Sequence, residues 1–197
     1  MTGAKNGSKA DDLVEEAQDI EEVILKGRKL QKGAGDINKT FAENAGIKIE
    51  RWISETKVFG QSANNTCAAT SLRMVLNDKK IVRTEDELAR ALKTDADGAS
   101  ILDIPEALDF KRIDEVTVIK DSEIELPTLL TKLEEGDKAV VSINTDEFGS
   151  HAVVFEKMEK GRVFLRDPLP INQGASYSIK LEDFEKIFNE KAVIIKK

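Results

Sequence analysis

Hydrophobic residues recur along the chain with two different periods, which predicts helices in its first part and mainly strands in its last part. Between Ala10 and Leu30 the apolar residues are three or four positions apart, which is the spacing of one helix face. The same spacing within Cys67–Asn77 predicts a second helix with a buried face. Later, the short apolar runs Ala139–Ile143 and His151–Phe155 fit buried strands.

Capping residues mark the ends of several other expected helices. Thr84 and Glu87 form a capping-box sequence, while Asp36 and Ser100 are N-cap residues. Further helices are expected at 37–44, 84–92, 101–110, 127–135 and 181–188, and strands or extended segments at 47–59, 115–119, 162–167 and 192–195. Helices therefore come first and a mostly antiparallel sheet follows, which is an α+β arrangement.

Composition excludes several classes of function. The chain has 197 residues, 40% of them hydrophobic, with a formal charge of −7 and a pI of about 5.0. This length suits a domain at residues 51–197 with a helical extension or linker at residues 1–50. The acidic balance argues against binding to nucleic acid or anionic membranes, and no apolar run approaches the ~18 residues of a membrane span. One cysteine and one histidine do not suffice for a disulfide or a typical zinc site, so we expect no metal or cofactor.

The single cysteine, Cys67, stands where a helix is expected to begin. The positive end of a helix dipole favours the thiolate, which is the nucleophilic form of cysteine. Gln61 lies six positions upstream, and its side-chain amide suits the stabilisation of an oxyanion beside the sulfur. Because most lone cysteines are small buried hydrophobic residues, Cys67 by itself does not establish catalysis.

The single histidine strengthens the catalytic interpretation. His151 opens an expected strand, and Asp167 ends the next one, Arg162–Asp167. A hairpin turn at Glu159–Gly161 would bring Asp167 back beside His151. There the carboxylate would orient the imidazole, and the imidazolium would hold Cys67 as a thiolate.

Gln61, Cys67, His151 and the dipeptide Asp167-Pro168 together resemble the papain-like cysteine peptidases, and most closely the bacteriocin-processing peptidases that remove double-glycine leaders. The resemblance covers roughly residues 58 to 195. It implies a papain-like fold in which the cysteine helix packs on the sheet that carries the histidine and aspartate. The chain departs from the family pattern in having Ala68 after the cysteine, where glycine is common.

Residues 1–50 lie outside that resemblance. The segment is charged and punctuated by glycine, and it resembles the region that precedes C-terminal effector domains in bacterial polymorphic toxins. This resemblance implies an antibacterial toxin, exported as part of a larger protein, whose cleft a cognate immunity protein would cover. The polar first residues show no signal peptide, so the expected location of the domain is otherwise undetermined.

Three functions are therefore open. The first is a thiol peptidase that acts on a peptide or protein, with Gln61, Cys67, His151 and Asp167 as its catalytic residues. The second keeps these residues for a protein glutamine deamidase or an acyltransferase, because the same thioester chemistry serves both. The third is an inactive peptide-binding domain, against which the intact set of four residues speaks.

Overall fold

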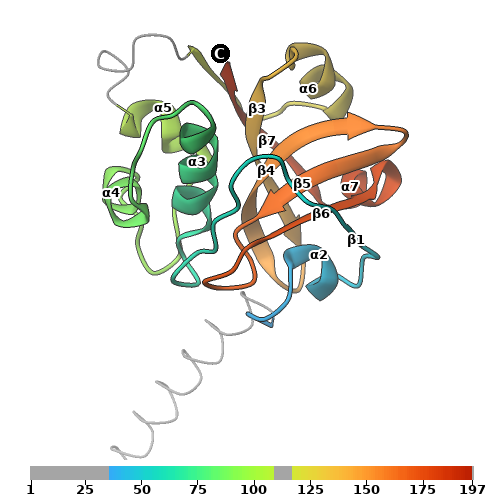
Figure 1. The fold of residues 1–197 in the computed structure, drawn as a ribbon, viewed down its shortest axis with the longest axis horizontal. Coiled ribbons are helices and arrows are strands. Elements are labelled where there is room, and N and C mark those ends of the chain that lie inside the picture. The colour runs from blue at the N-terminus through green and yellow to red at the C-terminus, as the bar shows by residue number, and fades with distance from the viewer. Residues whose placement is uncertain (1–35, 109–116, 197) are drawn as a thin grey trace, which may run out of the picture.

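In the computed structural model, an antiparallel sheet separates two groups of helices, and the structure describes residues 36–108 and 117–196 (Figure 1). The sheet has seven strands within these residues: β1 (Glu50–Arg51), β2 (Thr117–Asp121), β3 (Lys138–Thr145), β4 (Gly149–Glu159), β5 (Arg162–Asp167), β6 (Ala175–Lys180) and β7 (Phe188–Lys196). The helices are α2 (Phe41–Asn44), α3 (Cys67–Asp78), α4 (Glu85–Ala91), the 3-10 helix Ile101–Asp103, α5 (Ile104–Ala107), α6 (Leu126–Lys132) and α7 (Leu181–Ile187). The α+β class expected from the sequence is confirmed.

The strands follow the order β1-β6-β5-β4-β3-β7-β2, and every neighbouring pair is antiparallel. β4 lies between β3 and β5, so the strand that begins beside His151 is central in the sheet. Lys160 and Gly161 join β4 to β5 with φ angles of 51° and 72°. Positive φ at both central residues is typical of the two-residue turns that match the twist of a hairpin. The expected hairpin at Glu159–Gly161 is therefore present.

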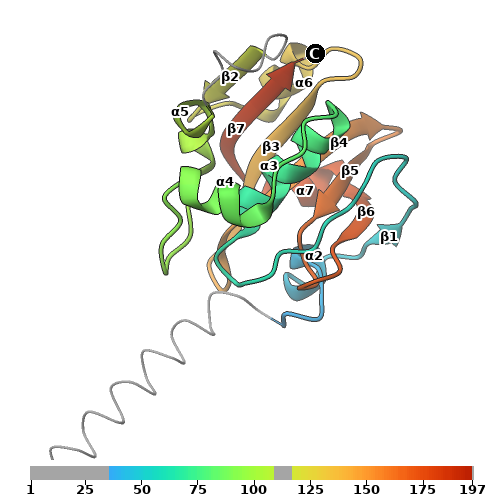
Figure 2. The same ribbon diagram turned by 60° about the vertical axis from the view of Figure 1, so that its left-hand side comes forward.

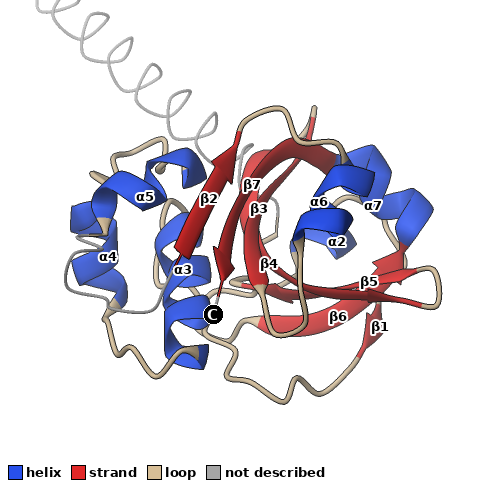
Figure 3. Ribbon diagram, turned by 90° about the horizontal axis from the view of Figure 1, so that it is seen from above, coloured by secondary structure: helices blue, strands red, loops and turns tan. Residues whose placement is uncertain are grey.

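The two sheet faces carry separate hydrophobic clusters. Figures 2 and 3 show the helices that lie on either side of the sheet. Helices α3, α4 and α5 cover one face, where they pack on Val140 and Val154. Helices α2, α6 and α7 cover the other face, where they pack on Val141 and Val153. Because neighbouring strand residues point to opposite faces, each of these apolar strands is buried on both sides.

A buried ion-pair network fixes the end of α3 to the sheet. Arg166 on β5 is fully buried, and its Nη2 lies 2.5 Å from Oδ2 of Asp78, the last residue of α3. Its Nε also pairs with Glu156 on β4, and its Nη1 donates to the carbonyl of Lys57 at 2.8 Å. Such a buried charge is tolerated because its partners replace the water it has lost.

Several boundaries differ from those expected. The helix expected at 37–44 begins at Phe41, because the side chain of Thr40 caps it; Asp36 instead caps the turn before it. The helix expected at 101–110 starts as a 3-10 turn at Ser100, whose side chain accepts a hydrogen bond from Leu102. The strand β6 was not expected. Its two serines and its lysine make the sequence look polar, although Tyr177 and Ile179 between them are buried. The helix expected between residues 10 and 30 lies outside the described residues, as do positions 109–110 and 115–116.

Candidate active site

Cys67 is the first residue of α3, as the sequence predicts. Thr66 occupies the N-cap position, but its hydroxyl donates to the carbonyl of Ala63 at 3.0 Å and makes no capping bond. The N–H groups of the first turn are thus left without a side-chain cap. They place the positive end of a twelve-residue helix at the sulfur.

The environment of the Cys67 sulfur stabilises the thiolate. Burial raises the pKa of the thiol, but a hydrogen bond to His151 and the positive charge of that residue outweigh burial, so the pKa is lowered. The backbone N–H groups of Ala152 and Ala68 also donate to the sulfur and lower the pKa further. A cysteine held in this way is a candidate nucleophile.

His151 links the cysteine to Asp167. Its side chain is 7% exposed, and Nε2 lies 2.7 Å from Oδ1 of Asp167. Burial alone would lower the pKa of His151, but the negative charges and hydrogen bonds of Asp167 and Cys67 raise it to about 10. The imidazolium is therefore favoured at neutral pH, beside the thiolate that it stabilises.

Asp167 is fully buried and receives four hydrogen bonds. Oδ1 accepts from His151 and from the N–H of Leu169 at 2.8 Å. Oδ2 accepts from the N–H of Phe41 and from the hydroxyl of Tyr177, both at 2.9 Å. These donors replace the water that a buried carboxylate has lost, so the charge stays directed at the imidazole.

Gln61 lies just before α3 and is 2% exposed. Its Nε2 donates to the carbonyl of Ala63 at 2.7 Å, while Oε1 has no hydrogen-bond partner within residues 36–108 and 117–196. Because an amide nitrogen carries two hydrogens, this contact leaves one for another acceptor. The backbone of Gln61 pairs with the loop that follows Asp167, through the carbonyl of Pro168 and the N–H of Asn172. The segments that carry Gln61 and Asp167 are therefore held side by side.

A cavity of about 420 Å³ opens beside the cysteine. Cys67 and His151 both contribute to its wall, together with Asn64, Asn65, Asp95, Asp97, Gly98, Ala99, Ser100, Ile101, Ser142, Ser150, Ala152 and Lys191. Within residues 36–108 and 117–196, no cluster of three acidic, histidine or cysteine side chains is placed to hold a metal ion. The same part of the chain contains no helix that is long and apolar enough to span a membrane.

The sequence did not point to two residues that contact the site. Phe41 stacks on the ring of His151, with centroids 5.3 Å apart and planes within 5°, and Tyr177 bonds to Asp167. Phe41 falls in the segment expected to be an extension, and Tyr177 falls on the unexpected strand β6. A lone aromatic residue in a polar segment is a weak signal, and only the fold brings these residues to the site.

The model of the Peptidase C39 family matches residues 55–197. The chain belongs to this family. Family membership makes it a cysteine peptidase-like hydrolase, and it confirms the resemblance to the bacteriocin-processing peptidases drawn from Gln61, Cys67, His151 and Asp167. None of the curated proteins compared with the chain matches it significantly.

Solved structures of C39 peptidases share the fold. The peptidase domain of Streptococcus ComA, a bifunctional ABC transporter of a quorum-sensing pathway, is 19% identical with a TM-score of 0.58, over 72% of this chain and 98% of that one. A double-glycine-motif protease from an AMS/PCAT transporter, solved with its leader peptide, is 22% identical with a TM-score of 0.57, over 75% of this chain and 96% of that one. At these identities the likeness shows the fold.

Proposed function

We propose that this C39 peptidase cleaves a peptide bond with the thiolate of Cys67 as its nucleophile. The observation that carries the proposal is the position of His151, which contacts Cys67 on one side and Asp167 on the other, at the wall of an open cavity. A buried structural histidine would need neither an acidic partner nor a cavity. Together these contacts provide a nucleophile, an acid–base group and an orienting carboxylate.

The reaction proceeds through a thioester. The Cys67 sulfur forms a bond to the carbonyl carbon of the peptide, and the carbonyl electrons move to the oxygen. The backbone N–H of Cys67 stabilises that oxyanion. Gln61 does not line the cavity in this structure, and we propose that its remaining amide hydrogen turns towards the oxyanion when substrate binds. His151 then gives its proton to the amide nitrogen, the C–N bond breaks and the amine leaves. Water then gives a proton to His151 and attacks the thioester carbon. The C–S bond breaks, which releases the new carboxyl terminus of the peptide and restores the Cys67 thiolate beside the imidazolium.

An extended peptide segment is the substrate that we propose for the cavity. One structural neighbour was solved with a leader peptide bound, which supports a peptide for this chain as well. Mass spectrometry of a bacterial lysate treated with the protein, with Cys67→Ala as its matched control, tests the proposal. New peptide termini that need Cys67 support it. A gain of one dalton at glutamine without new termini would show that the reaction is deamidation and not peptide cleavage. No change at all would favour an inactive peptide-binding domain.

An antibacterial role, with an immunity protein that covers the cleft, is the finer proposal drawn from residues 1–50. Its test is expression of the full chain in bacteria, with growth compared between wild type and Cys67→Ala at equal protein level. Growth arrest that needs Cys67 supports the role. Equal growth of the two strains would leave a peptidase without toxicity.

A further inference from the structure

The segment of residues 36–51 precedes the part of the chain that matches the C39 family, yet it contacts the catalytic histidine and aspartate. Phe41 is 3% exposed, and its ring lies parallel to that of His151. Its backbone N–H donates to Oδ2 of Asp167 at 2.9 Å. One residue of this segment therefore contacts both members of the His151–Asp167 pair.

A second contact runs from α2 to Asp167 through Tyr177. The N–H of Ala42 donates to the hydroxyl of Tyr177, which donates to Oδ2 of Asp167. Burial and the negative charge of Asp167 raise the pKa of Tyr177 well above its usual range, so this hydroxyl keeps its proton. The first two N–H groups of α2 thus support the carboxylate, one directly and one through a phenol.

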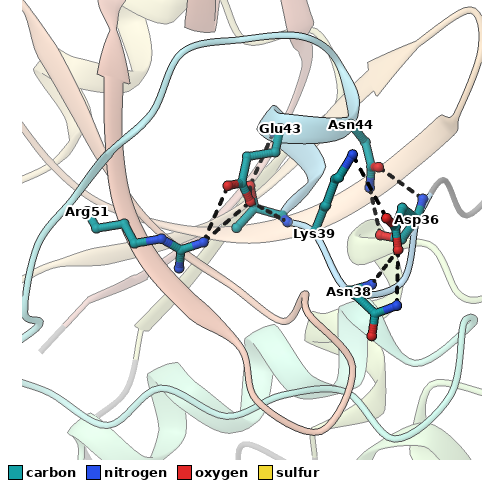
Figure 4. Close-up of polar contacts among 7 residues, drawn as sticks. Asp36, Asn38, Lys39, Glu43, Asn44 and Arg51 are labelled. Carbon is teal, nitrogen blue, oxygen red and sulfur yellow. Dashed lines mark hydrogen bonds and ion pairs between the residues drawn. The ribbon is translucent and has the colours of Figure 1, made fainter.

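Two polar clusters hold this segment in place, as Figure 4 shows. The carboxylate of Glu43 accepts from the N–H of Thr40 at 2.9 Å and pairs with Arg51 at 3.3 Å. Asn44 bonds to the backbone of Asp36 through both atoms of its side-chain amide. Arg51 is also the β1 residue that pairs with Tyr177 on β6. Hydrogen bonds and an ion pair therefore join the two ends of this segment to α2, and β1 fixes the segment to the sheet beside Tyr177.

We propose that Phe41 is a positioning residue of this peptidase, which holds the imidazole of His151 against Asp167 and excludes water from their hydrogen bond. The proposal rests on the proposed peptidase function. Phe41 does not line the cavity beside Cys67, so it acts on the ring and not on the substrate. A stacked ring restricts rotation of the imidazole, and a dry hydrogen bond to a carboxylate is stronger than a hydrated one.

The test compares Phe41→Leu with Phe184→Leu. Phe184 is also a fully buried phenylalanine of the same core cluster, but it packs on Phe155 and Phe188 away from the site. Both variants lose a similar apolar volume. We expect kcat to fall roughly tenfold in Phe41→Leu at unchanged KM, because a misplaced catalytic group mainly affects the chemical step. Phe184→Leu is expected to keep both constants at the wild-type values.

A proton NMR measurement gives a readout that needs no substrate. His151 is the only histidine, so the resonance of its Nε2 proton is identified by its loss in His151→Gln. We expect a downfield signal that exchanges slowly with water in wild type and in Phe184→Leu, and rapid exchange in Phe41→Leu. If wild type cleaves no peptide but shows this pattern, the proposed function fails and the positioning role stands.

A milder variant covers the case in which Phe41→Leu does not fold. Glu43→Ala changes a partly exposed side chain and removes the capping box of α2 together with the pair to Arg51. We expect kcat to fall about twofold to threefold, with faster exchange of the Nε2 proton. If every folded variant of α2 keeps both the wild-type kcat and slow exchange, or if Phe184→Leu has the same effect as Phe41→Leu, the proposal is overturned.

Discussion

The hydroxyl of Ser71 donates a hydrogen bond of 3.0 Å to the carbonyl oxygen of Ala152. Ser71 lies one helical turn after Cys67 on α3, and Ala152 follows His151 on β4. This bond therefore ties α3 to β4 within a few residues of both Cys67 and His151. The pairing of Asp78 with Arg166 fixes the other end of the same helix, so α3 cannot slide along the sheet.

We expect Ser71→Ala to lower the free energy of unfolding by about 1 kcal/mol, which is typical of one buried hydrogen bond. Peptidase activity should fall as well, by a few-fold in kcat, because Cys67 and His151 are then less tightly aligned. Urea unfolding and peptide hydrolysis measure the two effects. Unchanged kcat at reduced stability would show that the bond supports only the fold.

Thr70→Val is the matched control for Ser71. Thr70 is also fully buried on α3, but its hydroxyl has no hydrogen-bond partner among the residues that the structure describes. Replacing an unpaired buried hydroxyl by a methyl group of similar shape should raise the free energy of unfolding by about 1 kcal/mol. Activity should stay at the wild-type level. A loss of stability in urea unfolding would show that this hydroxyl has a partner in solution.

The reactivity of the only cysteine reports the ionisation of the site. Because His151 lowers the pKa of Cys67, alkylation by iodoacetamide should be rapid at pH values well below about 8.5, where an ordinary thiol is protonated. In His151→Ala only the backbone N–H groups of Ala152 and Ala68 still offset the burial of the thiol, so the midpoint of the pH–rate curve should move upward. Equal midpoints for the two proteins would exclude the thiolate–imidazolium pair.

The raised pKa of His151 also predicts how stability depends on pH. Its value of about 10 in the folded state lies above the unfolded value of about 6.5, so the folded state binds the proton more tightly. The resulting stabilisation is fully present below about pH 6.5 and is lost as the pH rises towards about 10. The difference in unfolding free energy between wild type and His151→Gln should therefore shrink from about pH 6 to about pH 10.5. A constant difference in urea unfolding would contradict the raised pKa.

Asp167→Asn tests the carboxylate. Asparagine keeps the shape but has one acceptor oxygen, so two of the four donors around the side chain lose their partner. We expect a loss of about 3 kcal/mol in stability, from the cost of unpaired buried donors, together with a large fall in kcat. Tyr177→Phe is the control, since it removes one donor and leaves the contact with His151. It should cost about 1 kcal/mol and keep most of the activity.

Gly60→Ala tests the close approach of the segments that carry Gln61 and Asp167. A Cβ atom at Gly60 would lie 2.1 Å from the backbone nitrogen of Gln173, where neither backbone is free to move. We expect at least about 3 kcal/mol of destabilisation, which is the upper end of the usual cost of adding atoms to a packed interior. At Gly46 φ is 71°, and among the described residues no atom beyond the two chain neighbours lies within 4 Å of the Cβ position. Alanine should therefore cost only about 1 kcal/mol there, through backbone strain. Thermal unfolding of both variants checks the difference.

The chain by itself determined the class of fold and pointed to the candidate residues of the site. Helical spacing after Cys67, apolar strand runs at His151 and Asp167, and the turn at Lys160-Gly161 are local properties that a sequence displays directly. The contact between His151 and Asp167 followed from them, because two strands joined by a short turn must lie side by side.

Only the tertiary structure decided what surrounds these residues. Phe41 and Tyr177 are 110 and 26 positions from His151 in the sequence, yet one stacks on its ring and the other bonds to its carboxylate partner. No local pattern marks such contacts, because they depend on how separate segments pack across the sheet. The electrostatics of Cys67 and His151 were likewise decided by burial and by distances between atoms, which a linear sequence does not contain.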